Sequence, residues 1–228
     1  MNVPASYRKR APGVTRRLER WYAECGRDFP WRRSRAGNYR LVATELLLQR
    51  TRAEVVARYY RDFFARFPGW SEASRARRRD LENAFKPLGL WKRRAQSFKA
   101  LAREMARRGG VFPASRGEIE SLPAVGQYVA NAVELFVHGR PRPLLDVNMA
   151  RIMERYFEPR RLADIRYDPL LQGLAQLLVE SAEDYRVINW AFLDLGALVC
   201  KPRNPRCGEC PLRRGCSRNG VDGGARGR

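Results

Sequence analysis

The sequence lacks long apolar runs and a secretory signal. No stretch of about 18 or more apolar residues occurs, and a helix needs roughly that many to span a bilayer. The N-terminal sequence MNVPASYRKRAPGVTRRLERW has no apolar stretch of the kind that forms the core of a signal peptide. We therefore expect a protein with no membrane partner, in the cytoplasm or associated with the nucleoid.

Strand signals are also missing. No convincing alternation of apolar and polar residues is present, and no Asn-Gly or Asp-Gly turn joins two apolar runs. Apolar residues instead recur at helical spacing. This spacing predicts helices over residues 15–25, 39–50, 53–67, 93–108, 129–137, 147–157, 169–182 and 186–199. The predicted fold class is all-α.

Negative charge is in short supply. The 228 residues include 45 lysines and arginines but only 24 aspartates and glutamates, which gives a formal net charge of +21. A polyanion is the natural partner of such a chain, and nucleic acid is the usual one because binding releases counterions from its phosphates. An acidic membrane surface is the alternative, but no basic amphipathic helix with an aromatic face stands out.

Cysteine is scarce outside one segment. Four of the five cysteines form the pattern Cys200-x6-Cys207-x2-Cys210-x5-Cys216. The fifth leaves an odd count and the expected compartment is reducing, so disulfides are not expected. Four thiolates suit either structural zinc or an iron–sulfur cluster, and spacing alone does not distinguish them.

A Pro/Gly turn precedes an apolar helix in the segment LPAVGQY, residues 122–128. It could be an ordinary helical hairpin. The turn and the start of the next helix also expose backbone N–H groups that can bind a phosphate oxygen without contacting a base. If the turn requires a positive φ at Ala124, its Cβ makes that conformation strained.

Two carboxylates stand in unusual surroundings. Glu45 lies inside the apolar run LVATELLLQ. It is either on the one wet stripe of its helix or bonded to a helix end, or it is a functional acid whose pKa is raised by burial. Asp146 precedes a helical pattern as an N-cap, which is a sufficient reason for an aspartate there. Capping N–H groups favour the anion, so we expect Asp146 to stay ionised.

Together these features resemble the endonuclease III branch of the helix-hairpin-helix DNA glycosylases. The resemblance runs from about Leu18 to Cys216. It rests on FPWRR (29–33), TELLLQRT (44–51), LGLWKRRA (88–95), LPAVGQY (122–128), LLDVNMARI (144–152) and the cysteine spacing, which in that group holds a [4Fe–4S] cluster.

The resemblance implies two helical lobes with a DNA-binding cleft between them. Residues 30–140 would form a six-helix barrel with the hairpin. Residues 1–29 and 141–228 would form the iron–sulfur domain, whose cluster loop is 200–216. The expected partner is double-stranded DNA with a mismatched or damaged base, bound by a monomer. A monovalent cation at the hairpin is a candidate second cofactor.

The resemblance also assigns roles to individual residues. Asp146 would stabilise the cationic sugar that develops as the base leaves, and Glu45 would act on the base or position water. Gln49 and Arg50 would fill the gap left in the duplex, and Leu90 would be a wedge beside the flipped base. The residues expected to contact the DNA backbone at the hairpin are Ala124, Gly126 and Gln127.

Tyr128 determines the expected reaction type. Lyase members of the family carry a lysine at this position, and its amine attacks the sugar and forms a Schiff base. Tyrosine cannot do so. We therefore expect a monofunctional glycosylase, without strong lyase activity, that uses water as the nucleophile.

The sequence does not decide which of two bases is removed, because two branches of the family fit. Four features favour thymine or uracil opposite guanine, or a relative that acts on modified pyrimidines: Gln49-Arg50-Thr51, Val147, the turn LGLWKRRA and the short sequence after Cys216. FPWRR favours adenine opposite guanine or oxidised guanine. A third alternative is a DNA-damage-binding protein that has lost catalysis, and retention of both Glu45 and Asp146 argues against it.

Overall fold

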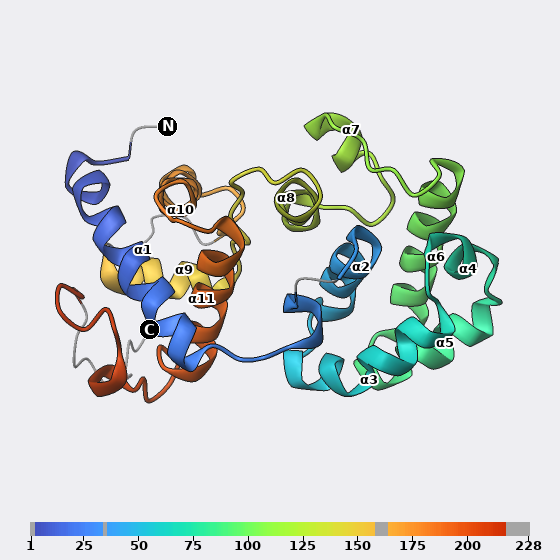
Figure 1. Ribbon diagram of the computed structural model, residues 1–228, viewed down its shortest axis with the longest axis horizontal. Helices are drawn as coiled ribbons and strands as arrows, with labels where there is room; N and C mark the ends of the chain where they lie inside the picture. The colour runs from blue at the N-terminus through green and yellow to red at the C-terminus, as the bar shows by residue number, and fades with distance from the viewer. Residues whose placement is uncertain (1–2, 34–35, 158–163, 218–228) are drawn as a thin grey trace. The chain divides into compact units, whose positions relative to one another are not determined.

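A computed structural model describes residues 3–33, 36–157 and 164–217 (Figure 1). All regular secondary structure in these ranges is helical, which confirms the predicted all-α class. The chain divides into two compact units. Unit 1 comprises Met1–Arg27 and Arg140–Arg228, and unit 2 is the continuous segment Asp28–Gly139. The barrel and cluster-domain assignments of these parts stay predictions.

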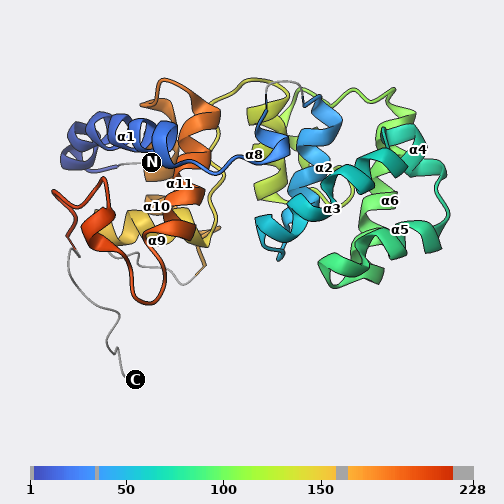
Figure 2. The same ribbon diagram turned by 60° about the horizontal axis from the view of Figure 1, so that its bottom comes forward.

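Unit 2 is built from seven of the described α-helices. They are α2 (Asn38–Leu48), α3 (Ala53–Arg66), α4 (Trp70–Arg75), α5 (Arg78–Phe85), α6 (Trp91–Arg107), α7 (Arg116–Glu120) and α8 (Gln127–Phe136), with the 3-10 turns η1 (Pro30–Arg32) and η2 (Lys86–Leu88). Helix α6 packs against α4 and α5, and α2 packs against α8 and α3 (Figures 1 and 2).

An aromatic cluster forms the centre of unit 2. The Phe63 ring lies 5.2 to 5.6 Å from four other phenylalanine rings, which belong to Phe64, Phe67, Phe85 and Phe98. Burying each phenylalanine stabilises the fold by roughly 1.5–3 kcal/mol. Phe63 and Phe64 lie on α3, and Phe67 is the residue that caps its C-terminus. The helix ends before Pro68, since a proline disfavours helical backbone in the preceding residue.

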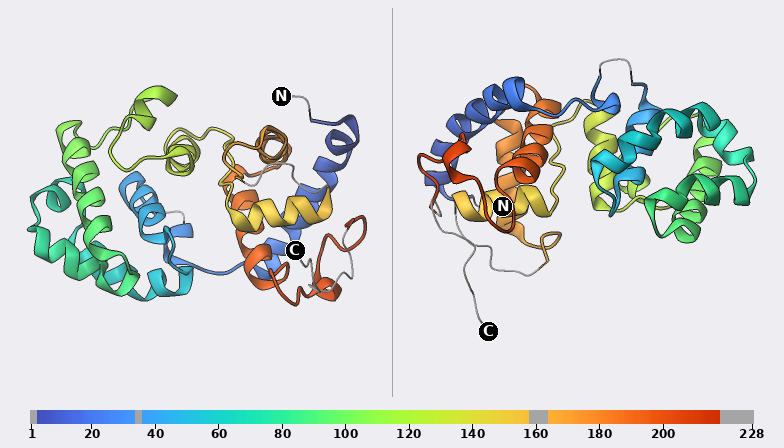
Figure 3. Two further views of the ribbon diagram at one scale, coloured as in Figure 1. Left: turned by 180° about the vertical axis from the view of Figure 1, so that it is seen from behind. Right: turned by 90° about the horizontal axis from the view of Figure 1, so that it is seen from below.

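Unit 1 combines the start of the chain with its second half. Its helices are α1 (Ala5–Cys25), α9 (Val147–Tyr156), α10 (Pro169–Glu180) and α11 (Tyr185–Leu198), followed by the 3-10 turn η3 (Cys207–Glu209). Helix α1 buries Tyr7, Ala11, Val14 and Leu18, spaced three or four residues apart, and packs against α10 and α11. Figure 3 shows the loop that follows α11 lying beside α9.

Helices α1, α4, α5 and α7 differ most from the sequence prediction, and α2 ends at Leu48, two residues before its predicted end at residue 50. Helix α1 begins ten residues before the predicted start at residue 15 and continues through Pro12. Packing of Tyr7 and Ala11 into the core of unit 1 outweighs the loss of one backbone hydrogen bond at the proline. Helices α4, α5 and α7 were not predicted, because five to eight residues are too few for a clear helical period.

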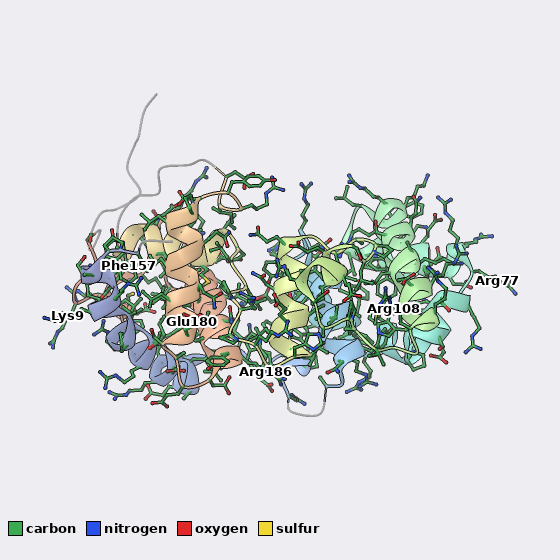
Figure 4. The ribbon with its side chains drawn as sticks, turned by 90° about the horizontal axis from the view of Figure 1, so that it is seen from above. Lys9, Arg77, Arg108, Phe157, Glu180 and Arg186 are labelled. Carbon is green, nitrogen blue, oxygen red and sulfur yellow. The ribbon has the colours of Figure 1, made fainter. Side chains whose placement is uncertain are left out.

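The excess positive charge lies on the outside of both units. Lys9 and Arg186 in unit 1 and Arg77 and Arg108 in unit 2 are exposed, and Figure 4 labels all four. Within the described ranges, no helix combines the length and apolar character that crossing a membrane requires.

Candidate functional site

A cavity of about 500 Å³ opens in unit 2 where three loops meet. The first follows α2, the second joins η2 to α6, and the third is the turn before α8. Four residues that the sequence predicts to contact DNA line this cavity, namely Gln49, Arg50, Leu90 and Ala124. The structure therefore brings together residues that are up to 75 positions apart in the chain.

Three of these cavity residues adopt left-handed backbone conformations. The φ angles are +57° at Arg50, +47° at Leu90 and +63° at Ala124. Such a conformation costs a residue with a Cβ about 1–2 kcal/mol. Strained residues persist where the surrounding structure holds them, and they cluster at functional sites. The sequence predicts strain in the hairpin if the turn requires a positive φ at Ala124, and the structure has a positive φ there.

Gly126 is the N-cap of α8 and has extended backbone, with φ −92° and ψ −179°. This conformation does not require glycine. A Cβ built at Gly126 would meet no atom within 4 Å. The exposed Gly126 therefore leaves open space at the start of α8, where the first N–H groups of a helix have no partner within the helix. The helix begins with the half-buried Gln127.

Glu45 and Tyr128 lie on neighbouring helices of unit 2. Glu45 is 4% exposed, within a stretch of α2 that is buried from Leu41 to Leu47. Tyr128 is the second residue of α8, half-buried and packed against the core of unit 2. Helices α2 and α8 pack side by side. Neither residue lines the 500 Å³ cavity.

Asp146 belongs to unit 1 and is the N-cap of α9, as predicted. Its Oδ1 accepts hydrogen bonds from the backbone N–H groups of Asn148 (2.8 Å) and Met149 (2.9 Å). Its Oδ2 accepts one from Asn148 Nδ2 at 2.7 Å. These contacts fix the orientation of the carboxylate at the start of the helix.

The charge state of Asp146 depends on burial as well as on the cap, so the expectation that it stays ionised remains a prediction. Burial raises the pKa of this carboxyl above its usual 3.8, and the hydrogen bonds from Met149 and Asn148 and the charge of Arg151 only partly oppose that rise. A raised pKa makes the carboxylate a stronger base than an ordinary aspartate.

A chain of hydrogen bonds links Asp146 to the cysteine loop. Arg151 Nη2 donates to Asn148 Oδ1 at 2.8 Å, and Arg151 Nε donates to the Cys200 carbonyl oxygen at 2.8 Å. Helix α11 passes close to this chain because it has a glycine there. A Cβ at Gly196 would lie 2.5 Å from Asn148 Cβ.

The four cysteines of the loop are half-buried, and Cys200, Cys207 and Cys216 each act electrostatically on Cys210. Burial, with the three other thiols contributing, raises the pKa of the Cys210 thiol to about 11. Arg155 Nη1 lies 3.4 Å from Cys200 Sγ and donates to the Lys201 carbonyl at 2.7 Å. The guanidinium is a positive charge of the kind that favours thiolates.

The chemistry of the loop limits which metal group it fits. Its donor set is four cysteine sulfurs, half-buried and beside the guanidinium of Arg155. Thiolates alone suit an iron–sulfur cluster, and they also suit a structural zinc ion. The ligands would be Cys200, Cys207, Cys210 and Cys216 in either case, and the donor set alone does not distinguish the two groups.

Two family models match the chain. The HhH-GPD superfamily base excision DNA repair protein model covers residues 43–166, and the model of the iron–sulfur binding domain of endonuclease III covers residues 200–216. The chain belongs to the HhH-GPD superfamily. This confirms the family predicted from the sequence, its DNA N-glycosylase class and its iron–sulfur cofactor.

Individual relatives agree with this HhH-GPD assignment. The chain is 36% identical to a thymine-DNA glycosylase of Aeropyrum pernix over 91% of this chain and 94% of the relative. It is 31% identical to an adenine DNA glycosylase of Mycobacterium tuberculosis over 91% of this chain and 74% of the relative. A solved thermostable thymine-DNA glycosylase superposes with a TM-score of 0.80 at 29% identity, covering 92% and 97% of the two chains.

Some residues of this HhH-GPD site were not found from the sequence. Asn148 and Arg151 follow the predicted N-cap, and their spacing of three on α9 was the only signal that they could contact each other. Arg94 lies in the basic run KRRA, and the sequence gave no reason to distinguish its half-buried guanidinium from the exposed side chains of Lys92 and Arg93. The monovalent cation at the hairpin stays a prediction.

Proposed function

We propose that this protein is a monofunctional DNA glycosylase that removes thymine or uracil mispaired with guanine. The observation that carries the proposal is Asp146, a half-buried carboxylate held by three hydrogen bonds at the start of α9 in a base excision repair protein.

The reaction breaks the bond between N1 of the pyrimidine and C1′ of deoxyribose. The electron pair leaves with the base, and C1′ becomes electron-poor. The fixed carboxylate of Asp146 stabilises this positive charge, and its raised pKa suits it to accept a proton from the attacking water. The products are a free base and an intact abasic site.

Tyr128 supports hydrolysis over a lyase reaction. A lyase needs an amine that attacks C1′, and the residue at the start of α8 has a phenol instead. Glu45 on the adjacent helix α2 would position the water or contact the base.

The cavity of unit 2 supports DNA opening. Gln49 and Arg50 are exposed at one edge of the cavity, and Leu90 is 60% exposed at another. An exposed leucine held in a left-handed conformation suits insertion into a base stack. The open space at Gly126 suits a phosphate at the N-terminus of α8.

The iron–sulfur cluster would hold the basic cysteine loop of unit 1 in one conformation.

Thymine or uracil is favoured over adenine by the relatives and by the site. The thymine-DNA glycosylase relative is more similar than the adenine relative and is covered over nearly its whole length. Val147, beside Asp146, is 66% exposed and adds an apolar surface where adenine enzymes generally have glycine. Adenine remains the second candidate, because the M. tuberculosis relative is 31% identical.

Four duplexes with identical flanking sequence test the proposal. They contain T opposite G, U opposite G, A opposite G, and A opposite oxidised guanine, each incubated with excess protein and split into samples with and without hot alkali. We expect strand breaks in the T and U duplexes only after alkali, and none with Asp146→Asn.

Each other outcome contradicts part of the proposal. Strand breaks without alkali would indicate a lyase. Excision of adenine alone would support the second candidate. Tight binding of a mismatch without excision of any base would indicate a damage-binding protein.

A further inference from the structure

Arg94, in the first turn of α6, connects two of the cavity loops. Its Nη2 donates to the carbonyl oxygens of Leu46 (3.1 Å) and Leu47 (2.8 Å) at the end of α2. Its Nη1 donates to the carbonyl oxygens of Leu88 (2.6 Å) and Gly89 (3.3 Å) in the turn before α6. One guanidinium thus spans the loop that carries Gln49 and Arg50 and the loop that carries Leu90.

Thr51 strengthens the same connection. Its Oγ1 accepts a hydrogen bond from Arg94 Nη1 at 2.9 Å and donates one to the Leu88 carbonyl oxygen at 2.9 Å. Backbone that would otherwise lack partners at the end of α2 is therefore satisfied by a side chain from another helix.

The acceptors around Arg94 are neutral. Among the described residues, no carboxylate forms an ion pair with it, and burial lowers the pKa of its guanidinium. Its guanidinium also lies 5.4 Å from the centre of the Phe85 ring. Burying a charge without a counter-charge is costly. If residue 94 only filled space, an apolar side chain would cost less. The hydrogen-bond donors of the guanidinium are therefore the property that matters at this position.

Both connected loops contain residues with left-handed backbone. Arg50, Gly89 and Leu90 have positive φ angles of 57°, 77° and 47°. Left-handed backbone outside glycine persists only when neighbouring contacts hold it. Arg94 supplies such contacts on both sides of the cavity.

We propose that Arg94 is a positioning residue that holds the Gln49–Arg50 loop and the Leu90 loop in the conformation that enters the duplex, before DNA arrives. The inference rests on the proposed function, because it requires that these loops open DNA. Its effect is preorganisation: the loops do not have to be ordered during the step that unstacks the target base.

The experiment measures unstacking apart from binding. An Asp146→Asn background keeps the DNA uncut, and 2-aminopurine placed next to a mismatched thymine becomes brighter when the stack opens. Arg94→Met removes the donors and keeps the stem. Arg94→Lys keeps the charge, but its single nitrogen cannot span both loops. Arg103→Met is the matched control, because Arg103 is exposed on the same helix, carries the same charge and does not line the cavity.

We expect Arg94→Met and Arg94→Lys to slow the fluorescence rise on the order of 100-fold, the effect typical of misplaced groups at an active site. Affinity for undamaged duplex, measured by anisotropy, should change no more than in Arg103→Met, which should keep the rate of the rise. A role limited to folding would instead reduce the amplitude with the folded fraction and leave the rate constant unchanged.

Thr51→Val decides the question if the Arg94 variants do not fold. It keeps the side-chain shape and removes only the Oγ1 bonds, so the rise should slow by a smaller factor, about tenfold. An unchanged rate constant in folded Arg94→Met, or in Thr51→Val, would overturn the inference. If the parent chain excises no base from any mismatch, the proposed function has failed instead.

Discussion

Replacing Ala124 with glycine should stabilise the protein, although glycine usually weakens a fold. Ala124 has φ +63°, and a Cβ there costs about 1–2 kcal/mol. Glycine removes that cost but gives the unfolded chain additional freedom worth about 0.5–1 kcal/mol. Ala124 is exposed, so little apolar burial is lost. The net gain expected for Ala124→Gly is about 0.5–1 kcal/mol.

Ala100→Gly is the matched control. Ala100 is exposed in the middle of α6, where glycine costs about 1 kcal/mol relative to alanine. Both substitutions remove the same methyl group from unit 2. The two variants should therefore differ by about 1.5–2 kcal/mol, with opposite signs relative to the parent protein.

Thermal unfolding followed by circular dichroism measures this difference. A change of 1 kcal/mol shifts the melting temperature by about 2–4 °C in a chain of this size. Ala124→Gly should therefore melt above the parent and Ala100→Gly below it. If Ala124→Gly is destabilised as much as Ala100→Gly, the strain assigned to the hairpin does not exist.

Four other perturbations test the site. The single-turnover rate should fall as the pH is lowered through the pKa of Asp146, because the anion is the active form. Burial places this pKa above 3.8. A rate that stays constant down to about pH 3.8 would contradict this prediction. Tyr128→Lys should give protein that borohydride traps on DNA, and no trapping would mean that residue 128 does not face the sugar. Cys210→Ser should lose iron and visible colour, whereas a colourless parent that contains zinc would refute the cluster assignment. Gly196→Ala should displace Asn148, cost about 1–3 kcal/mol by overpacking and lower the excision rate; full activity would show that Asn148 does not need its position.

The parts of the fold that follow a regular period were predictable. Helices such as α3 and α9 have apolar residues every three or four positions, and the N-cap role of Asp146 follows from its place before such a run. Short helices such as α4 and α7 depend on tertiary packing. The start of α1 was missed because Pro12 reads locally as a break.

The site was predictable where a residue type is unusual for its surroundings. Glu45 in an apolar helix and four clustered cysteines are conspicuous in the sequence. Arg94 is not, since its role depends on which carbonyl groups the fold brings within reach. The raised pKa of Asp146 was also hidden, because it reflects how deeply the carboxyl is buried, and spacing does not report depth.

The discontinuous composition of unit 1 has a consequence for how the chain folds during synthesis. Unit 2 is one continuous segment, so all its partners have been made once Gly139 has left the ribosome. Helix α1 is made before unit 2, but it packs against α10 and α11, which are made after unit 2. The apolar face of α1 therefore has no packing partner during most of translation. Truncated chains that end before α11 should expose that face to chaperones and proteases.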